Sequence, residues 1–217
     1  MIEADLICFD LDGTLVDSAQ DLAEATAQSL RALGIKPPSF EEIISHVGGG
    51  ARGLLRGSMG GEATDERVEA GLKAFMVFYD EHLLDNTRPY PGAREVLKHF
   101  FNKKTLALVT NKPDGFTVKI LEGLGLSGFF EEVLGYDSVE QKKPHPEGIL
   151  RVLTSTGIEP SRAVMVGDSP YDVLAGRGAG VVTVGATYGF KPLGELTASG
   201  PDHLIDDIRE LTTLIPI

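Results

Sequence analysis

The 217-residue sequence lacks several features that mark particular classes of protein. It contains one cysteine, Cys8, so no disulfide can form within the chain, and this predicts a reducing compartment. No stretch approaches the ~18 uninterrupted apolar residues of a membrane-spanning helix. The first apolar segment begins almost at Met1, which leaves no room for a signal peptide. These deficits predict a cytoplasmic protein without a membrane partner.

Positive charge is also scarce. The chain has 20 Lys and Arg residues against 32 Asp and Glu residues, for a formal net charge of −12. This balance disfavours a nucleic-acid or anionic-membrane partner. An anionic substrate must therefore be attracted by a local site, in which a bound cation is the main positive charge. The hydrophobic content of 42% predicts a globular protein with a sizeable core.

The most informative segment is residues 10–18, Asp-Leu-Asp-Gly-Thr-Leu-Val-Asp-Ser, directly after the apolar run 6–9. The run predicts a buried strand, and residues two apart on a strand point the same way, so Asp10 and Asp12 are expected to converge. Like charges this close raise one another's pKa unless a cation such as Mg²⁺ offsets them. These nine residues alone leave two interpretations open, a metal site and an ordinary acidic turn.

Three later segments supply polar side chains at fitting places. One apolar run ends at Thr110 and Asn111, another ends shortly before Asp168 and Asp172, and a lysine pair at 142–143 precedes a proline. Open parallel sheets carry their ligand sites at the carboxyl ends of the strands. The pooled carboxylates, hydroxyl and lysine suit a Mg²⁺-bound phosphate group.

The pattern of apolar residues divides the chain into two parts. Helical spacing without a clear strand extends over helices expected at 18–33, after 39, near 54–55 and at 65–84. After residue 91, expected strands at 105–110, 132–135, 163–166, 181–184 and 203–205 alternate with helices. This alternation predicts an α/β protein with a Rossmann-like parallel sheet formed by residues 1–16 and 88–217. Residues 17–87 are then an inserted all-helical cap domain.

Taken in order, these segments resemble the haloacid dehalogenase superfamily, specifically its phosphatases with an inserted helical cap. The similarity covers nearly the whole chain, and residues 89–92, 109–113, 142–146 and 188–189 further resemble bacterial phosphoglycolate phosphatases. The resemblance implies a Mg²⁺-dependent phosphomonoester hydrolase with an aspartyl-phosphate intermediate. It acts on 2-phosphoglycolate or a similar small phosphorylated metabolite, as a monomer or homodimer.

Other reactions occur on the same scaffold. A pyrophosphatase or sugar-phosphate phosphatase is the main alternative. A β-phosphoglucomutase-type phosphomutase is disfavoured, because such relatives carry a histidine five residues after the aspartate that matches Asp17, where this chain has Leu22. Dehalogenases and phosphonate-cleaving relatives lack an aspartate at the position of Asp12.

The resemblance also implies roles for individual residues of the core. Asp10 is the nucleophile and Asp12 the general acid/base. Asp10, the backbone carbonyl of Asp12, and Asp168 are the metal ligands. Thr110 and the backbone amide of Asn111 bind phosphoryl oxygens, although Asn111 also fits an ordinary turn.

The remaining roles involve a lysine, a second carboxylate and a glycine. The family lysine directly precedes a proline, which selects Lys143 over Lys142 as the cation beside the phosphate. Asp172 is expected to hold this lysine or a metal-bound water, and it also fits a helix N-terminus, where the helix dipole favours a carboxylate. Gly13 is expected to free a backbone amide for the phosphate.

Specificity is expected to lie in the cap. Residues 47–52 resemble the family's cap loop, and its Gly49 and Gly50 allow the backbone to approach a small substrate. The family often has a polar residue in place of Gly49. Arg52 suits a bidentate contact with a substrate carboxylate, and it equally suits an ordinary surface position.

Overall fold

The computed structural model describes residues 1–217, which form two compact units. Unit 1 consists of Met1–Asp17 and Pro89–Ile217, and unit 2 consists of Ser18–Arg88. None of the helices combines the length and the apolar character needed to span a bilayer.

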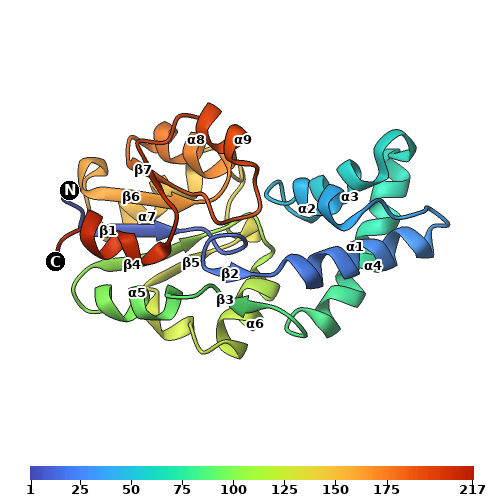
Figure 1. Ribbon diagram of the computed structural model, residues 1–217, viewed down its shortest axis with the longest axis horizontal. Helices are drawn as coiled ribbons and strands as arrows, with labels where there is room; N and C mark the ends of the chain where they lie inside the picture. Colours follow the sequence, from blue (N-terminus) through green and yellow to red (C-terminus); the bar gives the residue numbers. More distant parts are fainter. The chain divides into compact units, whose positions relative to one another are not determined.

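Unit 1 is built on a six-stranded parallel sheet with the order β5-β4-β1-β6-β7-β8 (Figure 1). Its strands are β1 (Leu6–Phe9), β4 (Thr105–Val109), β5 (Glu132–Leu134), β6 (Ala163–Gly167), β7 (Val182–Ala186) and β8 (His203–Ile205). The predicted fold class, a Rossmann-like α/β sheet with a helical insert, is confirmed.

The central strand β1 marks the point where the strand order reverses. Phe9 lies in register with Leu108 of β4 on one side and with Val166 of β6 on the other. The chain continues outward from β4 to β5 and then crosses over to β6. Ligands of open α/β sheets bind at such a reversal, outside the carboxyl ends of the strands. The segment that follows Phe9 therefore occupies the expected ligand-binding position.

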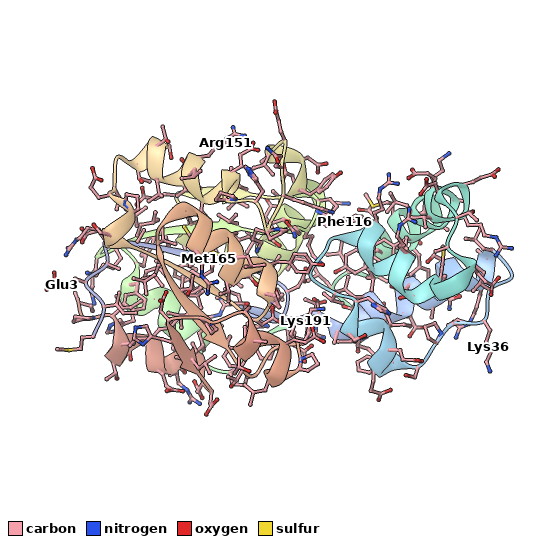
Figure 2. All side chains as sticks on the ribbon, turned by 90° about the horizontal axis from the view of Figure 1, so that it is seen from above. Glu3, Lys36, Phe116, Arg151, Met165 and Lys191 are labelled. Carbon is pink, nitrogen blue, oxygen red and sulfur yellow. The ribbon has the colours of Figure 1, made fainter.

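Helices cover both faces of this sheet. They are α5 (Ala93–Phe100), α6 (Asp114–Gly123), α7 (Glu147–Thr156), α8 (Pro170–Ala179), α9 (Leu193–Ala198) and α10 (Leu211–Leu214). In Figure 1, α5 lies on the opposite side of the sheet from α8. Alternate residues of the strands, such as Cys8 and Met165, pack against α7 and α8 because successive strand side chains point to opposite faces. Figure 2 shows Met165 among these layers, whereas Arg151 projects from α7 at the surface.

Unit 2 contains four helices: α1 (Ala19–Ala32), α2 (Phe40–Ser45), α3 (Ala51–Met59) and α4 (Asp65–His82). A capping box opens α2, because the Ser39 hydroxyl accepts from the Glu42 amide and the Glu42 carboxylate accepts from the Ser39 amide. Helices α1 and α4 pack against each other. The aromatic rings of Phe75 and Tyr79, both fully buried, stack at 5.2 Å in this core.

One buried carboxylate joins the two ends of unit 2. Asp21, in the first turn of α1, accepts hydrogen bonds from the backbone N–H groups of Asn86 and Thr87 at 2.8–3.0 Å. The Asn86 side-chain amide and the Thr87 hydroxyl also donate to it, at 2.9 and 2.7 Å. Ser18 occupies the N-cap position of α1, but its side chain makes no capping hydrogen bond. The entry and exit of the insert are thus held together by one side chain.

Short elements account for the differences from the expected pattern. Helix α9 was not anticipated, and the final helix α10 has only one turn. The two-residue strands β2 (Val16–Asp17) and β3 (Arg88–Pro89) pair where the chain passes between the units. Five 3₁₀ turns, η1 to η5, were likewise absent from the expected pattern. Elements this short carry too few residues to show a period.

Candidate active site

A buried ion pair lies at the carboxyl end of β1. The Lys143 ammonium donates to Oδ1 of Asp10 at 2.8 Å and to the Val109 carbonyl at 2.6 Å. Both charged side chains are at most a tenth exposed. Lys142, the neighbouring lysine, instead lies over the ring of Tyr136, 5.2 Å from its centre. The chain thus brings one lysine of the pair, Lys143, to the first aspartate of the opening motif.

Two further carboxylates lie beside this pair. Carboxylate oxygens of Asp10, Asp168 and Asp172 all lie within 4.8 Å of one another. Asp172 receives Lys143 on Oδ1 at 2.6 Å, and its Oδ2 accepts from the backbone amide of Ser169 at 3.1 Å. Asp172 therefore holds the lysine and also caps α8, so both expected environments of this side chain are present together.

Burial has the largest influence on the pKa values of this cluster, and the charges of neighbouring groups come second. Burial raises the pKa of Asp10 to about 6, an effect that Lys143 opposes and Asp172 reinforces. Burial likewise raises the pKa of Asp168 well above its ordinary value, with Asp172 and Asp10 adding to the increase. Burial alone lowers the pKa of Lys143, but the adjacent carboxylates Asp10 and Asp172 raise it above its usual range. The lysine is thus fully charged at neutral pH.

The donor set fits a hard divalent cation. Carboxylate oxygens of Asp10, Asp168 and Asp172 converge within 4.8 Å in a buried place. Like charges this close raise one another's pKa, and a bound cation would offset them. Carboxylate oxygens are the ligands that Mg²⁺ prefers. Because both oxygens of Asp172 are engaged by Lys143 and Ser169, Asp10 and Asp168 are the better placed to hold the ion.

The expected phosphate-binding residues follow β4. Thr110 and Asn111 are both buried, and the Thr110 hydroxyl accepts from the Lys112 amide at 3.3 Å. The Asn111 side chain donates to the Lys143 carbonyl at 2.9 Å. This bond fastens the loop that carries the lysine to the end of β4. Asn111 therefore contributes its side chain to holding the site together, which the sequence did not indicate.

The position of Gly13 is closely packed, and its expected role at the phosphate stays a prediction. Its amide donates to the Val16 carbonyl at 2.9 Å, so this donor is used inside its own loop. The residue has φ = 80°, and a side chain there would collide with the Asp168 carboxylate. Glycine at this position thus permits the close approach of Asp168.

A loop near the end of the chain supports the same carboxylate. The Phe190 amide donates to Oδ2 of Asp168 at 2.7 Å, and the Tyr188 hydroxyl donates to the Thr14 carbonyl at 3.0 Å. Any side chain at Gly189 would collide with Asp168. The sequence drew attention to residues 188–189 only as a resemblance and gave them no role.

Lys112 is a site residue that the sequence did not single out. Its ammonium lies 2.8 Å from Oδ2 of Asp12, and its side chain is 4% exposed. The residue lies inside a recognised motif, but a lysine in a loop after a strand usually faces solvent. The burial of Lys112 against the Asp12 carboxylate identifies it as a site residue, and this contact is visible only in the folded chain.

The residues expected to set specificity lie in unit 2. Gly49 and Gly50 precede α3, and Gly50 has φ = 79°. Arg52, in the first turn of α3, forms an ion pair with Glu69 of α4, and both side chains are about half exposed. Its role in recognising a substrate stays a prediction.

The comparisons agree with this geometry. The family model of the haloacid dehalogenase-like hydrolases matches residues 7–186. The chain belongs to this family. The expected relationship and the expected enzyme class are therefore confirmed, and the matched range contains Asp10, Thr110, Lys143 and Asp168.

Individual relatives extend over nearly the whole chain. Phosphoglycolate phosphatase 1 of Pseudomonas aeruginosa is 39% identical over 213 residues, which cover 95% of this chain and 78% of that protein. Phosphoglycolate phosphatase of Vibrio parahaemolyticus is 37% identical over 219 residues, covering 98% and 96% of the two chains. A crystal structure of a predicted phosphoglycolate phosphatase from Haemophilus somnus 129pt has a TM-score of 0.92 and 32% identity, and covers 99% of both chains.

Proposed function

We propose that this haloacid dehalogenase-like hydrolase is a Mg²⁺-dependent phosphomonoesterase that forms an aspartyl-phosphate on Asp10 and acts on 2-phosphoglycolate. The observation that carries the proposal is the Lys143–Asp10–Asp172 contact at the carboxyl end of β1. A buried carboxylate beside a charged lysine, with a second acidic group in the first turn of α8, suits attack on a phosphorus atom.

The first half of the reaction is the transfer of the phosphoryl group to the protein. Oδ2 of Asp10 attacks phosphorus while Lys143 holds Oδ1, so the nucleophile is oriented by its own partner. Thr110 and Lys143 stabilise the negative charge on the phosphoryl oxygens. Asp12 supplies the proton to the leaving oxygen.

The second half is hydrolysis of the aspartyl-phosphate. Asp12, now ionised, removes a proton from the attacking water, and the P–O bond to Asp10 breaks. The ammonium of Lys112 lies 2.8 Å from Oδ2 of this residue. Asp10 is regenerated and inorganic phosphate leaves.

Mg²⁺ belongs to the same proposal. When bound, it neutralises charge on the phosphoryl group and lowers the repulsion between a dianionic substrate and the carboxylates. Asp10, Asp168 and the backbone carbonyl of Asp12 are the proposed ligands. The convergence of the buried carboxylates supports this assignment.

The helical insert, residues 17–87, is proposed as the specificity cap. Its support is the chain topology, because both connections leave unit 1 directly beside the opening motif and at Pro89. The glycine-rich segment before α3 and Arg52 remain the candidates within it for contact with a small anionic substrate.

The names of three similar proteins support the choice of 2-phosphoglycolate as the substrate. Two are called phosphoglycolate phosphatase and are 37–39% identical to this chain, and the crystal structure is described as a predicted member of the same activity. A pyrophosphatase or a sugar-phosphate phosphatase is the alternative that must be tested beside it.

The test is a substrate panel of 2-phosphoglycolate, pyrophosphate and hexose phosphates, each measured with Mg²⁺ and with EDTA. We expect hydrolysis of 2-phosphoglycolate with Mg²⁺, none with EDTA, and none by Asp10→Asn. A preference of tenfold or more, ~1.4 kcal/mol, for another phosphate would overturn the substrate and leave the phosphatase. Full activity of Asp10→Asn would overturn the nucleophile.

A further inference from the structure

The loop that follows β7 contacts both the opening motif and Asp168. The Tyr188 hydroxyl donates to the Thr14 carbonyl at 3.0 Å, and the Phe190 amide donates to Oδ2 of Asp168 at 2.7 Å. Between these two residues lies Gly189, which is packed so closely that a Cβ there would collide with the Asp168 side chain. The loop therefore holds the backbone of the opening motif at one residue and the Asp168 carboxylate at the next two.

These contacts fix the orientation of the Asp168 carboxylate. Its Oδ2 receives the Phe190 amide and lies against Gly13 and Gly189, at both of which a Cβ would collide with this oxygen. The arrangement leaves Oδ1 for a cation beside Asp10. Hydrogen bonds of this kind orient a ligating carboxylate, and the loss of one weakens metal binding roughly 10- to 100-fold.

The position of the Phe190 amide depends on what holds the loop. On the sheet side, the Thr187 amide donates to the Ile205 carbonyl of β8 at 2.9 Å. On the side of the site, the Tyr188 side chain supplies the hydrogen bond to the opening motif. Burial raises the pKa of the Tyr188 phenol, so this group keeps its proton at neutral pH and acts as a donor.

A second tyrosine holds the ring of Tyr188 in place. The rings of Tyr90 and Tyr188 meet edge to face, with their centres 5.0 Å apart. The Tyr90 amide donates to the Leu15 carbonyl at 3.0 Å. Two successive carbonyls of the opening motif, those of Thr14 and Leu15, thus accept hydrogen bonds from the two members of one aromatic pair.

We infer that Tyr188 is a positioning residue for the divalent cation, because it fastens the loop whose Phe190 amide orients Asp168. The inference rests on the proposed function, in which Asp168 is a ligand of Mg²⁺. Without the phenol hydroxyl, the buried residue Thr14 loses the donor to its carbonyl and the loop loses this attachment to the opening motif. The affinity for the ion should then fall.

The experiment measures the binding of Mg²⁺ alone, by isothermal titration calorimetry without substrate. We expect Tyr188→Phe to raise the Kd for Mg²⁺ by roughly 10-fold or more. Activity at limiting Mg²⁺ should fall by a similar factor and recover as Mg²⁺ is raised. Tyr136→Phe removes the same hydroxyl from an exposed tyrosine and should leave the Kd unchanged. An unchanged Kd in Tyr188→Phe overturns the inference.

A second control separates positioning from a general loss of stability. Val152→Ala opens a small cavity in the buried core between α7 and the sheet, so it should lower Tm and leave the Kd for Mg²⁺ unchanged. If the Kd rises as much in Val152→Ala as in Tyr188→Phe, the affinity follows stability and the inference fails. Should Tyr188→Phe not fold, Phe190→Pro removes the amide that orients Asp168, and an unchanged Kd in that variant overturns the inference.

Failure of the proposed function gives different results. If the wild-type protein binds no Mg²⁺, the proposed cofactor is wrong and the inference falls with it. If it binds Mg²⁺, and Tyr188→Phe raises the Kd, but no phosphate ester is hydrolysed, only the proposed reaction is contradicted.

Discussion

The ammonium of Lys143 lies 2.8 Å from Oδ1 of Asp10, and the two residues are separated by 133 positions in the chain. A second carboxylate, Asp172, holds the same ammonium at 2.6 Å. The lysine is therefore oriented by one acid while it contacts the other. Substitutions of Lys143 can therefore test whether the reaction needs the positive charge at this position or only a positive charge.

Replacing Lys143 tests this positioning. Lys143→Met should lower kcat by about 10²- to 10³-fold, since it removes a preorganised positive charge from the phosphoryl group. Lys143→Arg should recover little, because a planar guanidinium cannot occupy the space of an ammonium held by Asp10, Asp172 and the Val109 carbonyl. Steady-state kinetics checks both, with Lys142→Met as the matched control. Near-normal turnover in Lys143→Met would remove this lysine from the reaction.

The raised pKa of Asp10 predicts how the stability of the metal-free protein depends on pH. Its pKa is about 6 in the folded protein, against 3.8 for the ordinary group. Between these values the folded state binds more protons than the unfolded state, so the contribution of Asp10 to stability falls as pH rises from about 4 to 6 and stays low above that range. Urea unfolding in EDTA at pH 4.5 and pH 7 measures the loss.

Asp10→Asn should remove this part of the pH dependence and leave the fold intact. The amide carries no charge to desolvate, so the variant is expected to equal or exceed the wild type in stability at pH 7. Glu122→Gln, an exposed neutralisation on α6, should leave the pH profile unchanged. A variant that loses stability equally at all pH values would show that the Lys143 contact outweighs the burial of the Asp10 charge.

Mg²⁺ should stabilise the folded protein by binding among the carboxylates. At 100 times the dissociation constant the gain is ~2.7 kcal/mol, which corresponds to a rise in Tm of about 5–10 °C for a chain of this size. Asp168→Asn should abolish most of the shift at the same concentration. Differential scanning calorimetry with and without Mg²⁺ checks it, and an unchanged shift in Asp168→Asn would exclude this residue as a ligand.

Asp21 should be important for stability even though it lies outside the catalytic cluster. Asp21→Ala leaves the donors of Asn86 and Thr87 without their acceptor in a buried place, at a cost of about 2–4 kcal/mol. Glu24→Ala, on the exposed side of the same helix, should change stability by no more than ~0.5 kcal/mol. Equal effects in the two variants, measured by urea unfolding, would contradict the structural role of Asp21.

The sequence predicted the fold well where long apolar runs end in polar residues. Strands β1, β4 and β6 are buried throughout or nearly so, and the end of each apolar run locates the polar residues that follow it, Asp10, Thr110 and Asp168. Short elements such as α9 and β2 were missed or unassigned because a few residues display no period. The sequence therefore predicts the strands of the sheet and misses mainly the shortest helices and strands.

The site was less predictable wherever a contact depends on packing between distant segments. Lys112 reads as an ordinary surface lysine until its contact with Asp12 is seen. The collision with Asp168 that excludes a side chain at Gly13 joins residues 155 positions apart, and the sequence does not show it. Residue type and strand position thus indicate which side chains gather, whereas the partners of each are fixed only by the folded chain.

The bonds that Asp21 makes with Asn86 and Thr87 have a consequence for how such chains diversify. Because the first turn of α1 is fastened to the residues just before Arg88, the ends of unit 2 leave side by side, like the ends of a folded loop. Segments with adjacent ends are readily inserted into a host domain or exchanged for another, since the host chain is interrupted at one point. Swapping residues 18–88 for the matching segment of a relative should therefore transplant substrate preference while the parallel sheet and its carboxylates stay as they are.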